Sequence, residues 1–180
     1  KNGINDTDRL NNLVSDLLLS ARLESTYQLN TELFSLEILI EECIQLLKQK
    51  FPSAIIKVNL IQEIPEILAD YSAIRSVIIN LLENAVKYSD SVPEINIGLT
   101  STNERCNIEV SDKGIGIDQS ERKKIFEKFY RAHSGNIHNV KGNGIGLSFV
   151  RKMVEAHGGS VSVRSEINKG TKFVINLPKY

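Results

Sequence analysis

The chain has 180 residues, 41% of them hydrophobic and 24% charged, which is the composition of an ordinary globular protein. Its 22 Lys and Arg residues balance its 22 Asp and Glu residues, so no net charge draws the chain to nucleic acid or to an anionic membrane surface. No apolar run approaches the ~18 residues that cross a bilayer.

The first predicted element is a helix over residues 6–25, begun by N-cap candidates in "NDTD". Leu10, Val14, Leu17 and Ala21 follow the heptad spacing of a helix that packs against another helix. This heptad pattern is short, so it is compatible both with a coiled coil and with one half of a helical hairpin. Because the chain starts at Lys1 without Met or a signal peptide, we expect it to be part of a longer protein.

Helix and strand patterns alternate through residue 88. Ser35 can cap a helix that runs through Lys50. The segments "AIIKVNLI" and "EILAD" have the apolar pattern of strands. Asp70 can then cap an apolar helix from Ile74 to Tyr88.

The second half of the chain favours two hairpins and a helix. "EINIGLT" and "RCNIEVS" alternate around a polar turn, as do "SVSVRS" and "KFVINLP" at the end of the chain. Between them, a short amphipathic piece, "ERKKIFEKFY", precedes a helix that starts near Gly144 and ends at "HGG". These elements predict an α+β fold, a two-layer sandwich of a mixed, mainly antiparallel sheet covered by helices and preceded by the N-terminal helix.

The apolar helix before Tyr88 carries a polar stripe. At about 100° per residue, Asn84 lies roughly 40° from Asn80, and Lys87 lies roughly 20° on the other side. A buried amide without a partner costs about 1–3 kcal/mol, so three aligned polar groups indicate a slot that a ligand fills. Amide oxygens bind hard cations such as Mg²⁺, and Lys binds phosphate. The alternative is that both asparagines cap loops or face water.

Three glycine clusters lie at element boundaries. Gly114 and Gly116 follow a strand that ends in Asp112, "KGNGIGLS" precedes a helix, and "NKGTKF" starts the last strand. Glycine lets a backbone approach a ligand closely, and a Gly-rich loop that opens a helix presents N–H groups to phosphate. The Asp112 carboxylate can accept a hydrogen bond from an exocyclic amine, or it is an ordinary turn residue.

Two common nucleotide-binding motifs are excluded. A dinucleotide fingerprint needs a strand that runs directly into the glycines, but the polar segment "RAHSGNIHNV" precedes these. The sequence contains no GxxxxGK[ST], which excludes a P-loop.

In this order, the segments resemble the ATP-binding catalytic domain of sensor histidine kinases, the two-component kinases with a Bergerat-type fold. "NLLENAVKYS" is similar to that family's N box, "SDKGIGID" to its first glycine box and "IFEKFYRAHS" to its F box. "GNGIGLSFVRKMVEAHGG" and "GTKFVINLP" are similar to the second and third glycine boxes. The resemblance implies a catalytic domain over residues 29–180. It also implies that residues 1–28 end the second helix of a dimerisation and phosphoacceptor hairpin.

The resemblance implies ATP and Mg²⁺ as ligands and assigns roles by position. Asn84 would be the main Mg²⁺ ligand, with Asn80 assisting. Asp112 would bind the adenine amino group, with Thr171 supporting it through a hydrogen bond. Asn80 and Asn84, together with Lys87 and Arg131 at the phosphates, would serve catalysis. The other implied nucleotide contacts are Tyr88, Gly114, Gly116, Ile117, Tyr130, Gly142, Asn143, Gly144, Ile145, Gly146 and Leu147, and Phe126 and Phe129 would anchor a lid.

The resemblance also separates this chain from ATP-hydrolysing relatives and related serine kinases. Those proteins carry a glutamate four residues before the Mg²⁺ asparagine, where this chain has Asn80, an amide that accepts no proton near pH 7. Glu83 points about 100° away from Asn84 and is a poor substitute. We therefore expect a protein-histidine kinase domain. The alternatives are a hydrolase or Ser/Thr-directed kinase, and a pseudokinase that signals by binding alone.

The implied reaction transfers the γ-phosphoryl group of ATP to a hairpin histidine, for relay to an aspartate of a response regulator. None of His133, His138 and His157 fits as the acceptor, so we expect no self-phosphorylation. The expected partners are the hairpin domain, dimeric in the full-length protein, and the cognate response regulator; the chain itself would be a monomer or weak dimer. Cys43 and Cys106, outside any CxxC or His cluster, fit buried thiols in the cytoplasm. The resemblance implies the cytosolic part of a membrane-bound receptor kinase.

Overall fold

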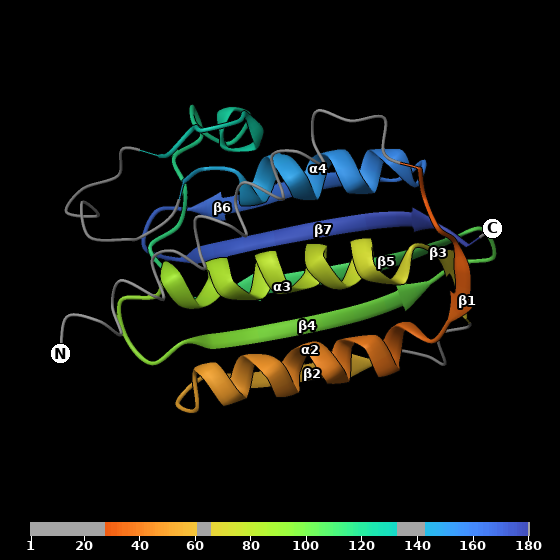
Figure 1. Ribbon diagram of the computed structural model, residues 1–180. Helices are drawn as coiled ribbons and strands as arrows, with labels where there is room; N and C mark the ends of the chain where they lie inside the picture. The colour runs from red at the N-terminus through yellow and green to blue at the C-terminus, as the bar shows by residue number, and fades with distance from the viewer. Residues whose placement is uncertain (1–27, 61–65, 133–142, 180) are drawn as a thin grey trace, which may run out of the picture.

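The computed structural model describes residues 28–60, 66–132 and 143–179, and the predicted heptad pattern over residues 6–25 lies outside these ranges. Figure 1 shows helices packed on one face of a five-stranded sheet with the strand order β2-β4-β5-β7-β6. In that order the strands are β2 (Ile55–Leu60), β4 (Glu94–Ser101), β5 (Arg105–Asp112), β7 (Gly170–Pro178) and β6 (Ser160–Glu166). Among the described strands only the β2–β4 pair is parallel, so the predicted mixed, mainly antiparallel two-layer fold is confirmed.

Within the described ranges, three α-helices cover the sheet: α2 (Leu36–Lys50), α3 (Tyr71–Lys87) and α4 (Gly146–Ala156). The Ser35 hydroxyl caps α2, and Asp70 Oδ1 caps α3 by accepting a hydrogen bond from the Ala73 N–H at 2.9 Å. That cap starts α3 at Tyr71, earlier than predicted. α4 starts later than predicted because Gly144 has a φ of +70°, which no α-helix contains.

The core lies between the helices and one face of the sheet. Alternate residues of β4 and β5 point toward α3 and are buried, as the period of two requires. The opposite face is polar, and a chain of hydrogen bonds crosses it from Arg105 through Asn176 and Asn107 to Thr100. An antiparallel sheet commonly buries one face and exposes the other to water.

Smaller elements complete the described fold. β1 (Glu32–Phe34) pairs with β3 (Ile67–Ala69) beside the start of α3, and η1 (Lys124–Phe126) is a short 3₁₀ helix before α4. Cys43 and Cys106 are buried free thiols, as predicted. Gly158 has the left-handed φ of +68° expected at the end of α4. Among the described helices, none has the length and apolar character needed to cross a membrane.

Candidate functional site

Asp112, the last residue of β5, has a half-buried carboxylate that two backbone groups orient. Its Oδ1 accepts hydrogen bonds from the N–H groups of Gly114 at 2.8 Å and Thr171 at 3.2 Å. Within the described part of the chain, its Oδ2 accepts none. Burial raises the pKa of the Asp112 carboxyl above its ordinary value, and the two backbone hydrogen bonds only partly oppose the increase. The expected hydrogen bond from Thr171 is present, and it comes from the backbone rather than from the hydroxyl.

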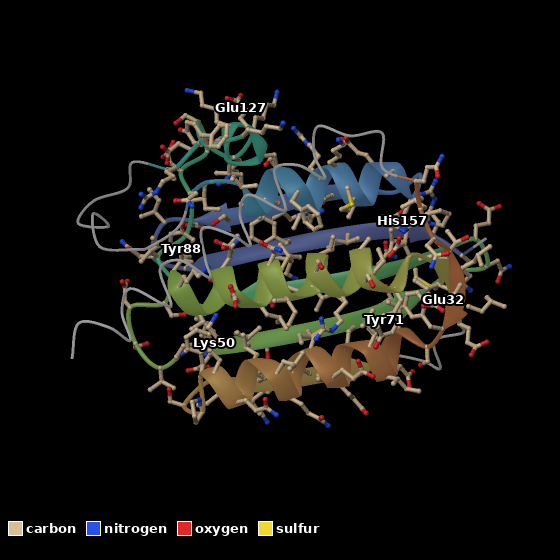
Figure 2. The ribbon with its side chains drawn as sticks, viewed as in Figure 1. Glu32, Lys50, Tyr71, Tyr88, Glu127 and His157 are labelled. Atoms are coloured by element: carbon tan, nitrogen blue, oxygen red, sulfur yellow. The ribbon has the colours of Figure 1, made fainter. Side chains whose placement is uncertain are left out.

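The loop that follows Asp112 lies against the C-terminal end of α3. The Ile115 N–H donates to the Tyr88 carbonyl at 3.0 Å, and a Cβ atom at Gly114 would overlap that same carbonyl. Gly116 has a φ of +73° and lies so close to the Glu166 carbonyl that a side chain would overlap it too. Close backbone approach therefore requires both glycines. It brings Asp112 near the end of α3 that Tyr88 occupies, opposite to the end of the molecule where His157 lies (Figure 2).

The predicted polar stripe lies on α3 where this helix passes the start of α4. Asn80 Nδ2 donates to the Ser76 carbonyl at 2.8 Å, and a Cβ atom at Gly146 would lie 2.6 Å from Asn80 Oδ1. The first residue of α4 thus directly faces the Asn80 amide. Asn84, one turn closer to Tyr88, is half-buried, and its side chain makes no hydrogen bond among the described residues. Within the described ranges nothing bonds to its amide oxygen, which can therefore accept a ligand.

Glu83 forms ion pairs with Lys50 at 2.8 Å and with Lys87 at 3.3 Å. Burial alone would raise the pKa of the Glu83 carboxyl, but the hydrogen bonds and charges of the two lysines outweigh it and lower the pKa. A carboxylate held by two cations is a weak base. The structure therefore agrees with the inference that Glu83 does not replace the glutamate of the hydrolysing relatives.

The N-terminus of α4 presents backbone N–H groups. Its N-cap residue, Ile145, makes no side-chain cap, and the Ser148 hydroxyl donates to the Ile145 carbonyl at 2.8 Å instead. The first N–H groups of a helix have no partner within that helix and carry the positive end of its dipole, so they suit an anion. Ile145 is buried and Leu147 packs partly against the core, so both would contact a ligand mainly through their backbone.

The segment before the second glycine box places its two phenylalanines differently. Phe126 is buried edge-on against Phe173, with ring centroids 6.3 Å apart, and the Arg151 guanidinium lies 4.8 Å from the Phe126 centroid. Phe129 is 66% exposed and has a φ of +64°, so its ring is not packed in the core, and its role as a lid anchor stays a prediction. The Phe129 N–H donates to the Gly144 carbonyl at 2.9 Å, and this backbone pairing leaves the ring in solvent.

The remaining predicted residues lie around these groups. Ile117 packs partly against the core beside the first glycine loop. The Tyr130 hydroxyl donates to Glu121 Oε1 at 3.0 Å, and Arg131 and Asn143 are exposed. Gly142 lies outside the described residues. The described residues thus form two clusters joined by α3, one at Asp112 and one at the N-terminus of α4.

The sequence analysis missed Ser165, on β6. A depression of about 410 Å³ opens beside Asp112, and its lining includes Ser165. The Ser165 hydroxyl contacts the first glycine loop and the start of β7. A signal was available, because Ser165 continues the positions of Val161 and Val163 in "SVSVRS" and should share their face.

The fold and the arrangement of these residues agree with a known family. Residues 69–180 match the family model described as histidine kinase-, DNA gyrase B- and HSP90-like ATPase, and the chain belongs to this family. The predicted resemblance to the catalytic ATPase domain of sensor histidine kinases, and with it the Bergerat-type fold, is confirmed.

Named relatives and a solved structure support the same assignment. Sensor protein RprX of Bacteroides fragilis (strain YCH46) is 45% identical over 122 residues, which are 67% of this chain and 24% of RprX. Sensor histidine kinase WalK of Bacillus subtilis (strain 168) is 32% identical over 97% of this chain and 29% of WalK. The structure of full-length ShkA in complex with AMPPNP superimposes with a TM-score of 0.83 at 28% identity, covering 97% of this chain and 36% of ShkA. The chain therefore spans between 24% and 36% of these proteins.

Proposed function

We propose that the chain binds ATP with Mg²⁺ where α3, the first glycine loop and the N-terminus of α4 meet, as the catalytic domain of a histidine kinase. The Asp112 carboxylate carries this proposal, because two backbone N–H groups hold Oδ1 while Oδ2 can accept from the adenine amino group. Family membership supports ATP as the nucleotide. Tyr88 would lie against the nucleotide, and Gly114 and Gly116 would form the floor beneath it.

The donor set fits Mg²⁺ in the manner usual for nucleotide sites. The described residues hold no group of three or more His, Cys, Asp or Glu side chains that could bind a metal ion. Mg²⁺ bound with a nucleotide takes one or two protein ligands and completes its shell with phosphate oxygens and water. The free Asn84 amide suits such a site, with Asn80 beside it. When bound there, Mg²⁺ would neutralise charge on the phosphates.

The phosphates would lie at the N-terminus of α4. Gly142, Asn143, Gly144 and Gly146 would let the backbone wrap the phosphate groups without side-chain interference. Arg131, which is exposed, would supply positive charge there. Lys87 would do the same by turning from Glu83 toward the nucleotide, and Glu83 would keep its ion pair with Lys50.

The nucleophile would come from outside this site. Asn80 is no general base, and Glu83 is paired with two lysines. His157 uses both ring nitrogens, since Nε2 accepts from the Asp70 N–H at 3.0 Å and Nδ1 contacts the Met153 carbonyl at 2.7 Å. We therefore infer that the γ-phosphoryl group passes to a histidine of a hairpin domain, and from there to a response-regulator aspartate. Positioning and charge neutralisation dominate phosphoryl transfer, so this division of roles is feasible.

Calorimetry tests the binding site. ADP with Mg²⁺ should bind the wild-type chain, and Asn84→Ala should abolish the contribution of Mg²⁺ to affinity. Gln45→Ala, which removes an exposed amide from α2, should leave binding unchanged. Retention of Mg²⁺-dependent affinity by Asn84→Ala would instead favour a module in which Asn84 binds no metal.

Radiolabelled ATP tests the reaction. The chain should acquire no label alone and should transfer label to a separately supplied hairpin domain of the same parent protein. Self-labelling would contradict the inference that the acceptor histidine lies outside this chain. Phosphate release as fast as that of a dedicated ATPase would favour the hydrolase instead.

A further inference from the structure

We infer that Ser165 is a positioning residue that holds Asp112 and the first glycine loop in the geometry that selects adenine. The inference rests on the proposed nucleotide site. Ser165 is the second-to-last residue of β6, directly opposite Thr171 of β7. It does not need to touch the nucleotide, because it acts through groups that would.

Three hydrogen bonds converge on the Ser165 hydroxyl. Its Oγ accepts from the Ile117 N–H at 2.8 Å, lies 2.8 Å from the Gly170 carbonyl and lies 2.9 Å from the Thr171 hydroxyl oxygen. A hydroxyl has one proton to donate and can accept twice. The Gly170 carbonyl can only accept, so Ser165 donates its proton there. The Thr171 hydroxyl must then donate to Ser165. The Ser165 hydroxyl thus donates one hydrogen bond, accepts two, and can make no more.

The backbone of Ser165 is also held. An Arg122 Nη2 group donates to the Ser165 carbonyl, from the segment that follows the first glycine loop. Ser165 therefore holds the first glycine loop and β7 through its hydroxyl, and holds the segment after that loop through its backbone carbonyl. A valine side chain at this position could make none of the hydroxyl contacts.

The bonds of Ser165 reach Asp112 through one intermediate residue. Thr171 receives support from Ser165, and the Thr171 N–H donates to Asp112 Oδ1 at 3.2 Å. Gly170, whose carbonyl Ser165 holds, has a φ of +101° and lies so close to the Asp112 backbone that a side chain would overlap it. Loss of the hydroxyl would therefore loosen one of the two N–H donors that fix the rotation of the Asp112 carboxylate.

The direction of Asp112 Oδ2 should affect the binding of adenine more than the binding of hypoxanthine. Adenine has an exocyclic amine that can donate to a carboxylate, whereas hypoxanthine has a carbonyl at that position and cannot. A loosened carboxylate should lose the adenine hydrogen bond without changing contacts that both bases share. A change in the preference for adenine over hypoxanthine therefore distinguishes a positioning role of Ser165 from a general loss of structure.

The test compares ADP and IDP, each with Mg²⁺, by calorimetry on the full 180-residue chain. Ser165→Ala should weaken ADP binding about tenfold, the factor that corresponds to 1.4 kcal/mol, and should weaken IDP binding less. Ser165→Thr keeps the hydroxyl and should restore the preference for ADP. Ser162→Ala is the matched control, because Ser162 lies on the exposed face of the same strand.

Each other outcome overturns the inference. Unchanged ADP affinity in Ser165→Ala, or equal losses for ADP and IDP, would leave Ser165 with no role in adenine selection. If Ser165→Ala does not fold, Thr171→Val removes the hydroxyl that donates to Ser165 and keeps the backbone N–H; it should reduce the ADP preference in the same direction, and an unchanged preference would refute the inference. Failure of the wild-type chain to bind ADP would refute the proposed function instead.

Discussion

The backbone N–H of Asp70 donates to Nε2 of His157 at 3.0 Å and so joins the start of α3 to the end of α4. The Asp70 carboxylate caps α3 at Ala73 and also accepts from the Asn30 N–H at 3.0 Å. His157 Nδ1 lies 2.7 Å from the Met153 carbonyl, so Nδ1 carries the proton and Nε2 is free to accept. This junction fixes both helices at the end of the molecule opposite to the candidate site.

His157→Ala should lower the free energy of unfolding by about 1–3 kcal/mol, the cost of leaving a buried donor without its acceptor. The donor is the Asp70 N–H, and Asp70 is buried. Urea denaturation measures the change. Glu155→Ala, an exposed substitution near the end of the same helix, is the control and should change stability far less. Equal effects of the two substitutions would show that the junction adds no stability.

Gly116→Ala should destabilise the chain and weaken ADP binding, because the new Cβ would overlap the Glu166 carbonyl at a left-handed φ. A cost above about 1 kcal/mol is expected, since alanine is strained at such a φ. The control is Gly98→Ala, where the added Cβ would lie 3.5 Å from the Glu109 Cβ, an ordinary contact. Thermal melts and ADP titrations of both variants measure the difference. Wild-type stability in Gly116→Ala would mean that the loop can move away from β6.

Asp112→Asn should separate stability from binding. Folding raises the pKa of the Asp112 carboxyl, so the folded chain binds a proton more readily than the unfolded chain. The free energy of unfolding therefore falls as pH rises from the ordinary Asp pKa, about 3.9, through the raised value. Asparagine removes this charge and keeps an oxygen for both N–H donors. At pH 7 the variant should be at least as stable as the wild type, and yet it should lose ADP affinity.

Urea denaturation between pH 4 and 8 and ADP calorimetry check this expectation. Asp118→Asn is the comparison, because hydrogen bonds from Ser120 lower the pKa of the Asp118 carboxyl. Its substitution should not stabilise the chain at neutral pH. A less stable Asp112→Asn chain would show that the charged carboxylate supports the fold.

Glu83→Gln should lower stability modestly and leave phosphoryl transfer to a supplied hairpin domain intact. The pKa of the folded Glu83 carboxyl is lowered, so its stabilising effect is present above the ordinary Glu pKa, about 4.3, and is lost as pH falls through the folded value. Partly exposed ion pairs contribute about 0.2–1 kcal/mol each and weaken with salt. Urea denaturation at low and high salt measures the contribution of these ion pairs to the free energy of unfolding. Abolished transfer in a well-folded Glu83→Gln chain would identify Glu83 as the missing base.

Local pattern was enough to predict most elements of the fold. Ser35 and Asp70 each cap a helix, and alternating apolar residues form β4 and β5, because caps and periodicity depend on neighbours in the sequence. The start of α4 differed from the prediction because it depends on the φ of Gly144. The exposure of the Phe129 ring was not predictable from local pattern, because the backbone of Phe129 pairs with Gly144, which is distant in sequence.

The sequence by itself predicted a nucleotide as the ligand, because an amide stripe, an aspartate and three glycine clusters stand in the order that resembles the ATP-binding catalytic domain of sensor histidine kinases. Only the tertiary structure decided how these groups are held. Three contacts join segments far apart along the chain: the Ser165 hydroxyl accepts from the Ile117 N–H, Glu83 pairs with Lys50, and His157 accepts from the Asp70 N–H. Hydrogen bonds and ion pairs of this kind leave no periodic trace in the sequence, because they arise only when packing brings the partners together.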